Sequence, residues 1–178
     1  MGGYGSGWRG AKKATVEDGL VLSMTDLVRK GAAVPGSWTR GSWVWRHGYG
    51  SPEDRVTASI GYEANLVDPE AAWLRLQYSA SGEAVDYRVR LTTTRPHYGG
   101  LRWWFLCPLA RPDGEDARRV GKLYLPPGAR YFGSRRAYGL TYRSCQESGK
   151  FNGLFRALAA QMGTDEATVR RALKETAW

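Results

Sequence analysis

Cysteine and histidine are both scarce in this sequence, with two residues of each among 178. Cys107 and Cys145 are too few for a framework of disulfides, so we expect both thiols to stay reduced, as in a cytoplasm. A zinc site with four protein ligands is not expected either. His97 and Cys107 could share a metal ion, but two ligands do not complete a site, and a surface or strand-end histidine is the simpler interpretation.

Long apolar runs and catalytic motifs are also missing. No segment approaches the length of a membrane-crossing helix, and the glycine-rich N-terminus lacks an apolar signal core, so we expect a soluble cytoplasmic protein. No Ser-His-Asp order, Walker loop or histidine–carboxylate cluster is present. Asp113, Glu115 and Asp116 share one loop, but a magnesium site would need a second acidic cluster. We expect no enzymatic activity and no cofactor.

Acidic residues are few where basic residues are many. The formal net charge is +9, and residues 101–178 hold 14 basic residues against 7 acidic ones. Between Arg118 and Arg143 there are seven basic residues and no acid. A field of this kind attracts polyanions, of which nucleic acid is the commonest. The alternative is a solvated basic face that serves solubility.

Residues 98–145 contain two apolar or aromatic strand-like runs, each followed by a tight turn. The order strand, knuckle, strand, strand, knuckle, strand is that of a zinc ribbon, whose four ligands are usually a cysteine pair at each knuckle. Only Cys107 stands at such a place. The pattern therefore predicts a basic β segment that is zinc-ribbon-like and holds no metal.

The same residues carry a resemblance to a known family. The chain opens with Met-Gly-Gly-Tyr-Gly-Ser-Gly, has Arg-Leu-Thr-Thr-Thr at 90–94, and matches further over 104–144. In these features it resembles a widespread bacterial family whose zinc-ribbon-like core follows the pattern Trp-Phe-x-Cys-Pro, Cys-Gly-Arg-Arg-Val and Tyr-Phe-x-Cys-Arg-x-Cys-Tyr. Members of that type have cysteines where this chain has Asp116, Ser134 and Ala137. The resemblance implies the fold and a lost metal site, and it implies no activity.

Residues 1–13 are rich in glycine and basic residues and bury too little to order themselves. One interpretation is a flexible arm along a phosphate backbone, with Tyr4 and Trp8 available for stacking on bases. The alternatives are a plain tail or an arm that packs on its own domain.

Residues 14–97 predict a short helix followed by an antiparallel sheet. Ser23 can cap a helix over 23–30, and Gly31 suits its C-terminal end. Alternation with period two over 37–95 predicts a meander, with a first pair of strands around Arg40-Gly41 and a turn at 79–82. We expect most tryptophans in the core or in cross-strand pairs, although a few could form a platform for stacking bases.

Residues 146–178 predict a helical hairpin. Apolar residues recur at helical spacing from Phe151 to Met162, Gly163 ends that helix, and a second helix follows. The spacing of Ala159, Gly163 and Val169 is typical of a helix-turn-helix, but it is also found in plain hairpins docked on another core.

Together these patterns predict an α+β fold and non-enzymatic binding of nucleic acid or a nucleoprotein complex. The rival hypothesis is a mobile-element inhibitor or adaptor that binds a host protein complex, as anti-CRISPR proteins do. No metal ligands are assigned. The expected nucleic-acid contacts are Arg118, Arg119, Lys122, Arg130, Arg135, Arg136, Arg143, Arg170, Arg171, Lys174, Arg9, Lys12 and Lys13.

Overall fold

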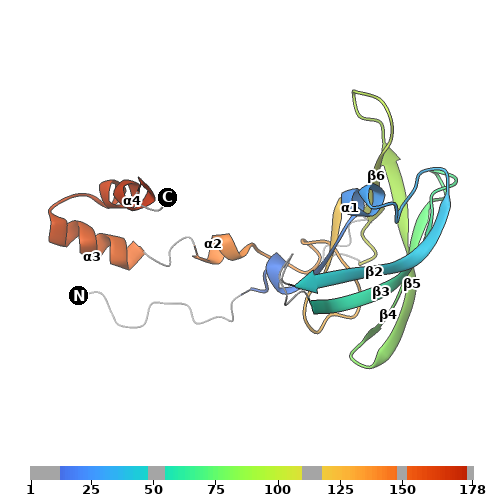
Figure 1. Ribbon diagram of the computed structural model, residues 1–178, viewed down its shortest axis with the longest axis horizontal. Coiled ribbons are helices and arrows are strands. Elements are labelled where there is room, and N and C mark those ends of the chain that lie inside the picture. Colours follow the sequence, from blue (N-terminus) through green and yellow to red (C-terminus); the bar gives the residue numbers. More distant parts are fainter. Residues whose placement is uncertain (1–12, 48–54, 110–117, 148–151, 176–178) are drawn as a thin grey trace. The chain divides into compact units, whose positions relative to one another are not determined.

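The computed structural model describes residues 13–47, 55–109, 118–147 and 152–175. It is mostly antiparallel β-sheet with a few helices, an α+β fold (Figure 1). Two compact units divide the chain, the first ending at Leu140 and the second beginning at Thr141. Within the described ranges, no helix has the length and apolar character needed to cross a bilayer.

A six-stranded antiparallel sheet forms the main part of the first unit, and its spatial order follows the chain. The strands are β2 (Trp38–His47), β3 (Arg55–Asn65), β4 (Trp73–Ala80), β5 (Glu83–Thr94), β6 (Arg102–Leu106) and β7 (Arg119–Val120). The expected meander is therefore confirmed. The expected pair of strands around Arg40-Gly41 is wrong, because β2 runs unbroken through both residues and pairs with β3 along its length.

The turn between β4 and β5 shows why the chain reverses where the sequence predicts. Ser81 and Gly82 both have positive φ, 52° and 83°, the backbone of a two-residue hairpin turn whose twist matches that of the flanking strands. This tight turn fixes the register by pairing Ala80 with Glu83. Because side chains alternate along a strand, Leu76, Val85 and Val89 then lie on the same, buried face.

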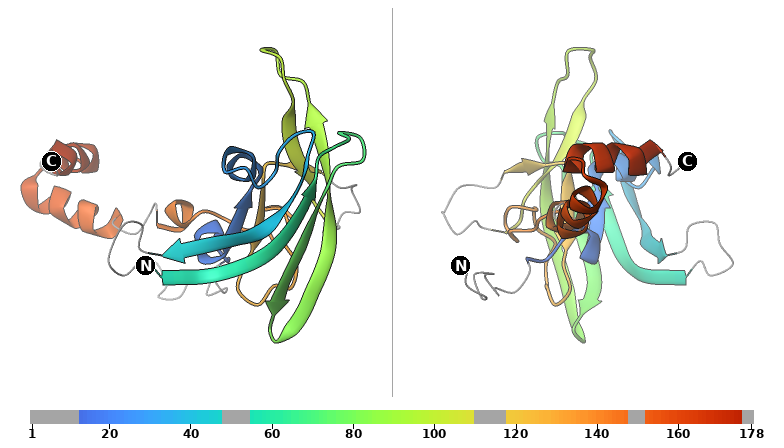
Figure 2. Two further views of the ribbon diagram at one scale, coloured as in Figure 1. Left: turned by 45° about the vertical axis from the view of Figure 1, so that its right-hand side comes forward. Right: turned by 90° about the vertical axis from the view of Figure 1, so that its left-hand side faces the viewer.

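A helix and a second, two-stranded sheet pack on one face of the meander (Figure 2). Strand β1 (Leu20–Ser23) pairs with β8 (Lys122–Leu125), and the 3-10 turn η1 (Val16–Asp18) precedes it. Helix α1 (Met24–Arg29) begins as expected at Ser23, whose hydroxyl accepts a hydrogen bond from the Asp26 amide. The helix ends at Arg29, and Gly31, with a φ of 73°, closes a Schellman motif after it.

The core lies between the sheet and these elements. Its largest buried side chains come from both layers: Leu22, Met24 and Leu27 on one side, Leu74, Leu76, Val89 and Phe105 on the other, and Leu123 and Phe132 from the basic segment. Each fully buried side chain of this size stabilises the fold by roughly 1.5–3 kcal/mol. Among the described elements of this unit, none covers the opposite face of the sheet.

Residues 98–140 do not form a separate extension. The boundary expected after residue 97 falls between two paired strands, since β5 pairs with β6, and β6 with β7. The fourth strand expected at the end of the ribbon is absent over 134–142 of the described chain. The backbone turns there instead, and Leu140 packs with Val16 and Tyr124 in a small second cluster.

The second unit is helical. It contains α2 (Arg143–Glu147), which the sequence pattern did not predict, then α3 (Asn152–Met162) and α4 (Glu166–Glu175). Gly163 has a φ of 62°, and the Thr164 amide donates to the Ala159 carbonyl at 3.0 Å, which ends α3 as expected. Asp165 caps α4 by accepting bonds from the Ala167 and Thr168 amides. The Thr168 hydroxyl also donates to the Asp165 carboxylate, at 2.7 Å, and this bond, followed by those from the amides, holds the Asp165 pKa below its ordinary value.

Candidate nucleic-acid interface

A pocket of about 390 Å³ lies where β7 and β8 meet the turn after Gly133. We call it the basic pocket, and its lining residues are Arg118, Arg119, Val120, Gly121, Lys122, Tyr124, Ser134, Arg135 and Arg136. All five cations are exposed, and among the described residues no acid forms an ion pair with Arg119, Lys122 or Arg136. Five positive charges around one concavity create a field that attracts anions.

Cys107 joins the two sides of the basic pocket. Its amide donates to the Arg118 carbonyl at 3.0 Å, which holds the strand side. Its sulfur accepts a hydrogen bond from the Ser134 amide at 3.2 Å, which holds the turn side. Cys107 and Ser134 are both buried. The Cys107 thiol therefore fixes the spacing between the two groups of arginines that line the pocket.

The turn on the far side of the basic pocket has its own geometry. The Ser134 hydroxyl accepts a bond from the Ala137 amide at 3.0 Å, an arrangement favoured by a serine that begins a tight turn. The Leu140 amide then donates to the Arg135 carbonyl at 2.9 Å. These bonds leave the side chains of Arg135 and Arg136 exposed at the pocket's edge.

Three tyrosine hydroxyls hold the backbone that leads into this turn. Tyr78 donates to the Arg130 carbonyl at 2.7 Å, Tyr87 accepts from the Phe132 amide at 2.9 Å, and Tyr138 donates to the Tyr131 carbonyl. Burial raises the pKa of all three phenols. They therefore stay protonated at neutral pH, as donation by Tyr78 and Tyr138 requires.

The structure places only some of the expected contact residues together. The basic pocket unites Arg118, Arg119, Lys122, Arg135 and Arg136. Arg130 does not line it: its guanidinium pairs with Glu83 at 2.6 Å and lies 5.7 Å from the Tyr131 ring centre.

The other expected contacts fall elsewhere. Arg143 belongs to α2 and Arg171 is exposed on α4, both in the second unit. Arg170 and Lys174 are also on α4, with side chains outside the described part of the structure. Lys13 is exposed, while Arg9 and Lys12 lie outside the described residues.

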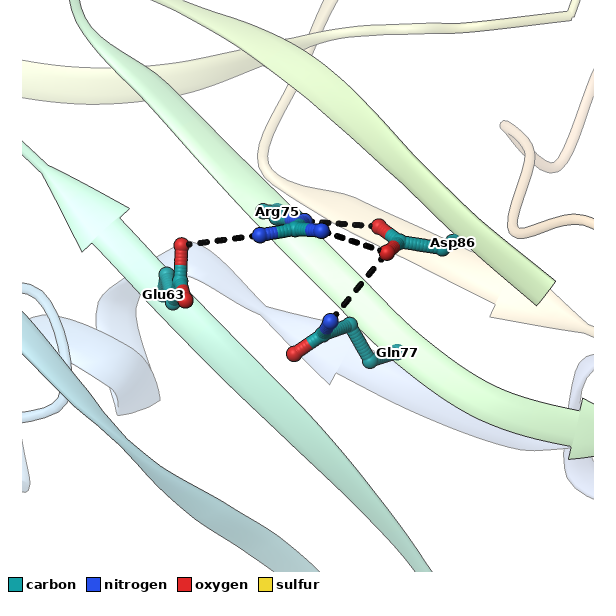
Figure 3. A network of polar contacts seen from close by, with 4 residues as sticks. All are labelled: Glu63, Arg75, Gln77 and Asp86. Carbon is teal, nitrogen blue, oxygen red and sulfur yellow. Dashed lines mark hydrogen bonds and ion pairs between the residues drawn. The ribbon is translucent and has the colours of Figure 1, made fainter. Parts of the chain in front are cut away.

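The solvent-facing side of the sheet carries a polar network that sequence reasoning missed (Figure 3). Arg75 donates two hydrogen bonds to Asp86, at 2.7 and 2.6 Å, and a longer one to Glu63 at 3.4 Å. Gln77 also donates to Asp86, at 3.1 Å. The bonds from Arg75 and then Gln77 hold the Asp86 pKa below its ordinary value. The period-two alternation places Arg75 and Gln77 on one face, but only the strand register shows that Asp86 lies opposite Gln77.

No group of three histidine, cysteine or acidic side chains that could hold a metal ion occurs within the described ranges. His97 is exposed and packs edge-on against Tyr98, with ring centres 5.6 Å apart. The acids of the loop at 113–116 lie outside the described residues.

Comparison with known proteins gives no match to a family model, a curated protein or a solved structure. The fold and the site therefore define this protein by themselves. It is an α+β protein with a mainly antiparallel sheet and a pocket of five basic side chains at the sheet's edge.

Proposed function

We propose that this protein binds nucleic acid without catalysis and that the basic pocket contacts the phosphate backbone. The observation that carries the proposal is the convergence of five exposed cations from two separate stretches, residues 118–122 and 135–136. Guanidinium groups suit this role because their planar donors match phosphate oxygens in pairs. Contacts to phosphate fix the position of a nucleic acid on the protein but carry no sequence information. They therefore account for a surplus of basic residues without requiring side chains that read bases.

Two finer proposals accompany this function. The first is that the turn around Ser134 is a zinc knuckle that has lost its ligands. The Ser134 amide donates to the Cys107 sulfur, and the Ala137 amide donates to the Ser134 oxygen, which supports this origin because the pattern resembles a knuckle with serine and alanine in place of two cysteines.

The second is that α3 and α4 form a helix-turn-helix-like hairpin that adds contacts to nucleic acid. The two helices contact each other, and Ala159 and Val169 are buried on either side of Gly163. Arg171 is exposed on α4, where it can reach a phosphate. Arg171→Glu should then weaken binding while leaving the melting temperature unchanged, and an unaffected affinity would leave α3 and α4 as a structural cap.

Charge reversal at the basic pocket tests the main proposal. Arg135→Glu with Arg136→Glu should weaken binding of a labelled oligonucleotide, measured by fluorescence anisotropy over a range of salt concentrations. Each phosphate contact that is lost should flatten the salt dependence by about one unit of slope.

The matched control is Arg29→Glu with Lys30→Glu, another adjacent basic pair. Neither residue lines the basic pocket: Arg29 pairs with Asp26 at 2.6 Å, and Lys30 lies 5.0 Å from the Trp43 ring centre. Equal losses from the two double variants would remove the basic pocket from the interface. A binding partner whose affinity barely changes with salt would favour the protein-binding adaptor instead.

A further inference from the structure

The solvent-facing side of the sheet carries three tryptophans and five arginines. The register places the following side chains on it: Trp38 and Arg40 from β2, Trp73 and Arg75 from β4, Arg88 and Arg90 from β5, and Arg102 and Trp104 from β6. We call this surface the Trp/Arg face. It lies opposite the core-facing side, where Trp43, Trp45 and Trp103 pack.

The three rings of the Trp/Arg face are accessible. Trp38 is 65% exposed, although burying an aromatic ring is among the largest favourable contributions that a side chain can make. Trp73 and Trp104 are partly exposed, and each carries a guanidinium over its ring, Arg88 and Arg102 respectively, both at 4.2 Å from the ring centre. None of the three rings fills the core.

The charge of the Trp/Arg face is positive. Its two carboxylates, Glu63 and Asp86, are both bound by Arg75 (Figure 3). Arg40, Arg90 and Arg102 make no ion pair with any described acid. The network therefore neutralises the acids at the centre and leaves cations around and between the rings.

The Trp/Arg face is continuous with the basic pocket. A Cβ built on Gly121, which lines the pocket, would lie 3.6 Å from the Trp104 ring. Arg119, also in the pocket, is paired with Leu106 at the same edge of the sheet. In the other direction the register puts Trp73 two strands from Trp38, a step of about 10 Å.

We propose that the Trp/Arg face binds single-stranded nucleic acid. Its bases stack on the tryptophans, and its phosphates contact the arginines along a path that continues to the basic pocket. This rests on the proposed function and names its class of ligand. Alternating rings and cations suit a single strand because its bases are free to stack, whereas a duplex encloses them. Tryptophan and arginine are also enriched in protein–protein interfaces, and the salt dependence of binding distinguishes a protein partner from a nucleic acid.

Trp38 gives the sharpest test, since its exposure means that replacement should leave the fold intact. Trp38→Ala should weaken binding of a labelled single-stranded oligonucleotide by about fivefold or more, the loss expected for one stacked base. Trp38→Tyr should restore most of the affinity, because a phenol ring also stacks. Tyr98→Ala is the matched control, an aromatic residue that is 97% exposed outside the face. Melting temperatures check that each variant folds.

Binding is measured with three ligands: a single strand of DNA, a single strand of RNA of the same sequence, and a DNA duplex of that sequence. Trp38→Ala should lower affinity for single strands of either sugar and leave duplex affinity and the salt slope unchanged. Arg135→Glu with Arg136→Glu should lower affinity for all three. A wild-type protein that prefers the duplex, or equal effects of Trp38→Ala and Tyr98→Ala, would overturn the proposal that the Trp/Arg face binds single strands. The proposal that the basic pocket contacts phosphates would be unaffected. If the wild-type protein binds none of the three, both proposals fail.

Discussion

Cys107 shows how one small side chain can hold a surface site together. It bonds to both sides of the basic pocket, through its amide to Arg118 and through its sulfur to Ser134.

Cys107→Ala should therefore destabilise the protein by roughly 1–3 kcal/mol, because the buried Ser134 amide loses its acceptor. Urea unfolding measures the change. Cys145→Ala is the control, since Cys145 is exposed and its replacement should cost no more than about 0.5 kcal/mol. A Cys107→Ala protein as stable as the control would show that the sulfur contact contributes little.

Asp86 predicts a dependence of stability on pH. Its pKa is lowered by Arg75 and Gln77, so its contribution is fully present above the ordinary aspartate value of about 3.9 and is lost as pH falls through the lower folded-state pKa. Asp86→Asn should lower the melting temperature at neutral pH, and the difference from wild type should close as pH falls below about 3.9 and through the lowered folded-state pKa. Glu70→Gln, which removes an exposed loop carboxylate, is the control measured over the same pH range. A constant difference across the range would exclude the ion pair as its cause.

At the scale of elements, two glycines in the helical unit should respond in opposite ways to alanine. Gly163 has a φ of 62°, so Gly163→Ala forces a side chain into the left-handed region at a cost of about 1–2 kcal/mol. Gly153 lies within α3 with open space at its Cβ position, so Gly153→Ala should stabilise the helix by up to about 1 kcal/mol. Far-UV circular dichroism during heating compares the two. A loss of helix in both variants would mean that the turn at Gly163 is not what limits this unit.

Gly133, in the β unit, is required for a different reason, because the space around its Cα leaves no room for a side chain. A Cβ there would lie 2.3 Å from the Leu109 side chain and 2.8 Å from the Tyr138 ring, while both backbone groups bond to Tyr124. Gly133→Ala should destabilise the protein by roughly 1–3 kcal/mol through overpacking. Gly61→Ala, in the middle of β3 with ordinary contacts at 3.5 Å and beyond, should change stability little. Chemical denaturation that finds equal effects would point to backbone entropy as the common cause.

At the scale of the whole molecule, a zinc ribbon would bring together residues from both ends of the basic segment. We expect the purified protein to hold no stoichiometric zinc, because a structural site normally needs four ligands. Replacing Asp116, Ser134 and Ala137 together by cysteine should create a site with Cys107 that retains zinc through gel filtration. Elemental analysis of the wild type and the triple variant decides the matter. Zinc in the wild type, or none in the variant, would contradict the lost-knuckle origin.

The sequence by itself determined the local structure. Ser23, Gly31, Gly82 and Gly163 act through their own backbone and nearest neighbours, so the helix ends and the hairpin turn were predictable. Alternation likewise predicted the meander, because strand period depends only on side-chain direction. It misplaced a turn at Arg40-Gly41, since a glycine within a strand looks the same in sequence as a glycine in a turn.

Only the tertiary structure decided which surfaces form. Strands β6 and β7 join the main sheet because β6 buries Trp103 and Phe105 against the same core as β5, a gain that a separate ribbon would lack. Pairing between distant strands also decided that five of the basic residues share a pocket and that Arg130 faces Glu83 instead. The Trp/Arg face depends on register across β2 to β6, and register is a property of strand pairs that no single segment contains.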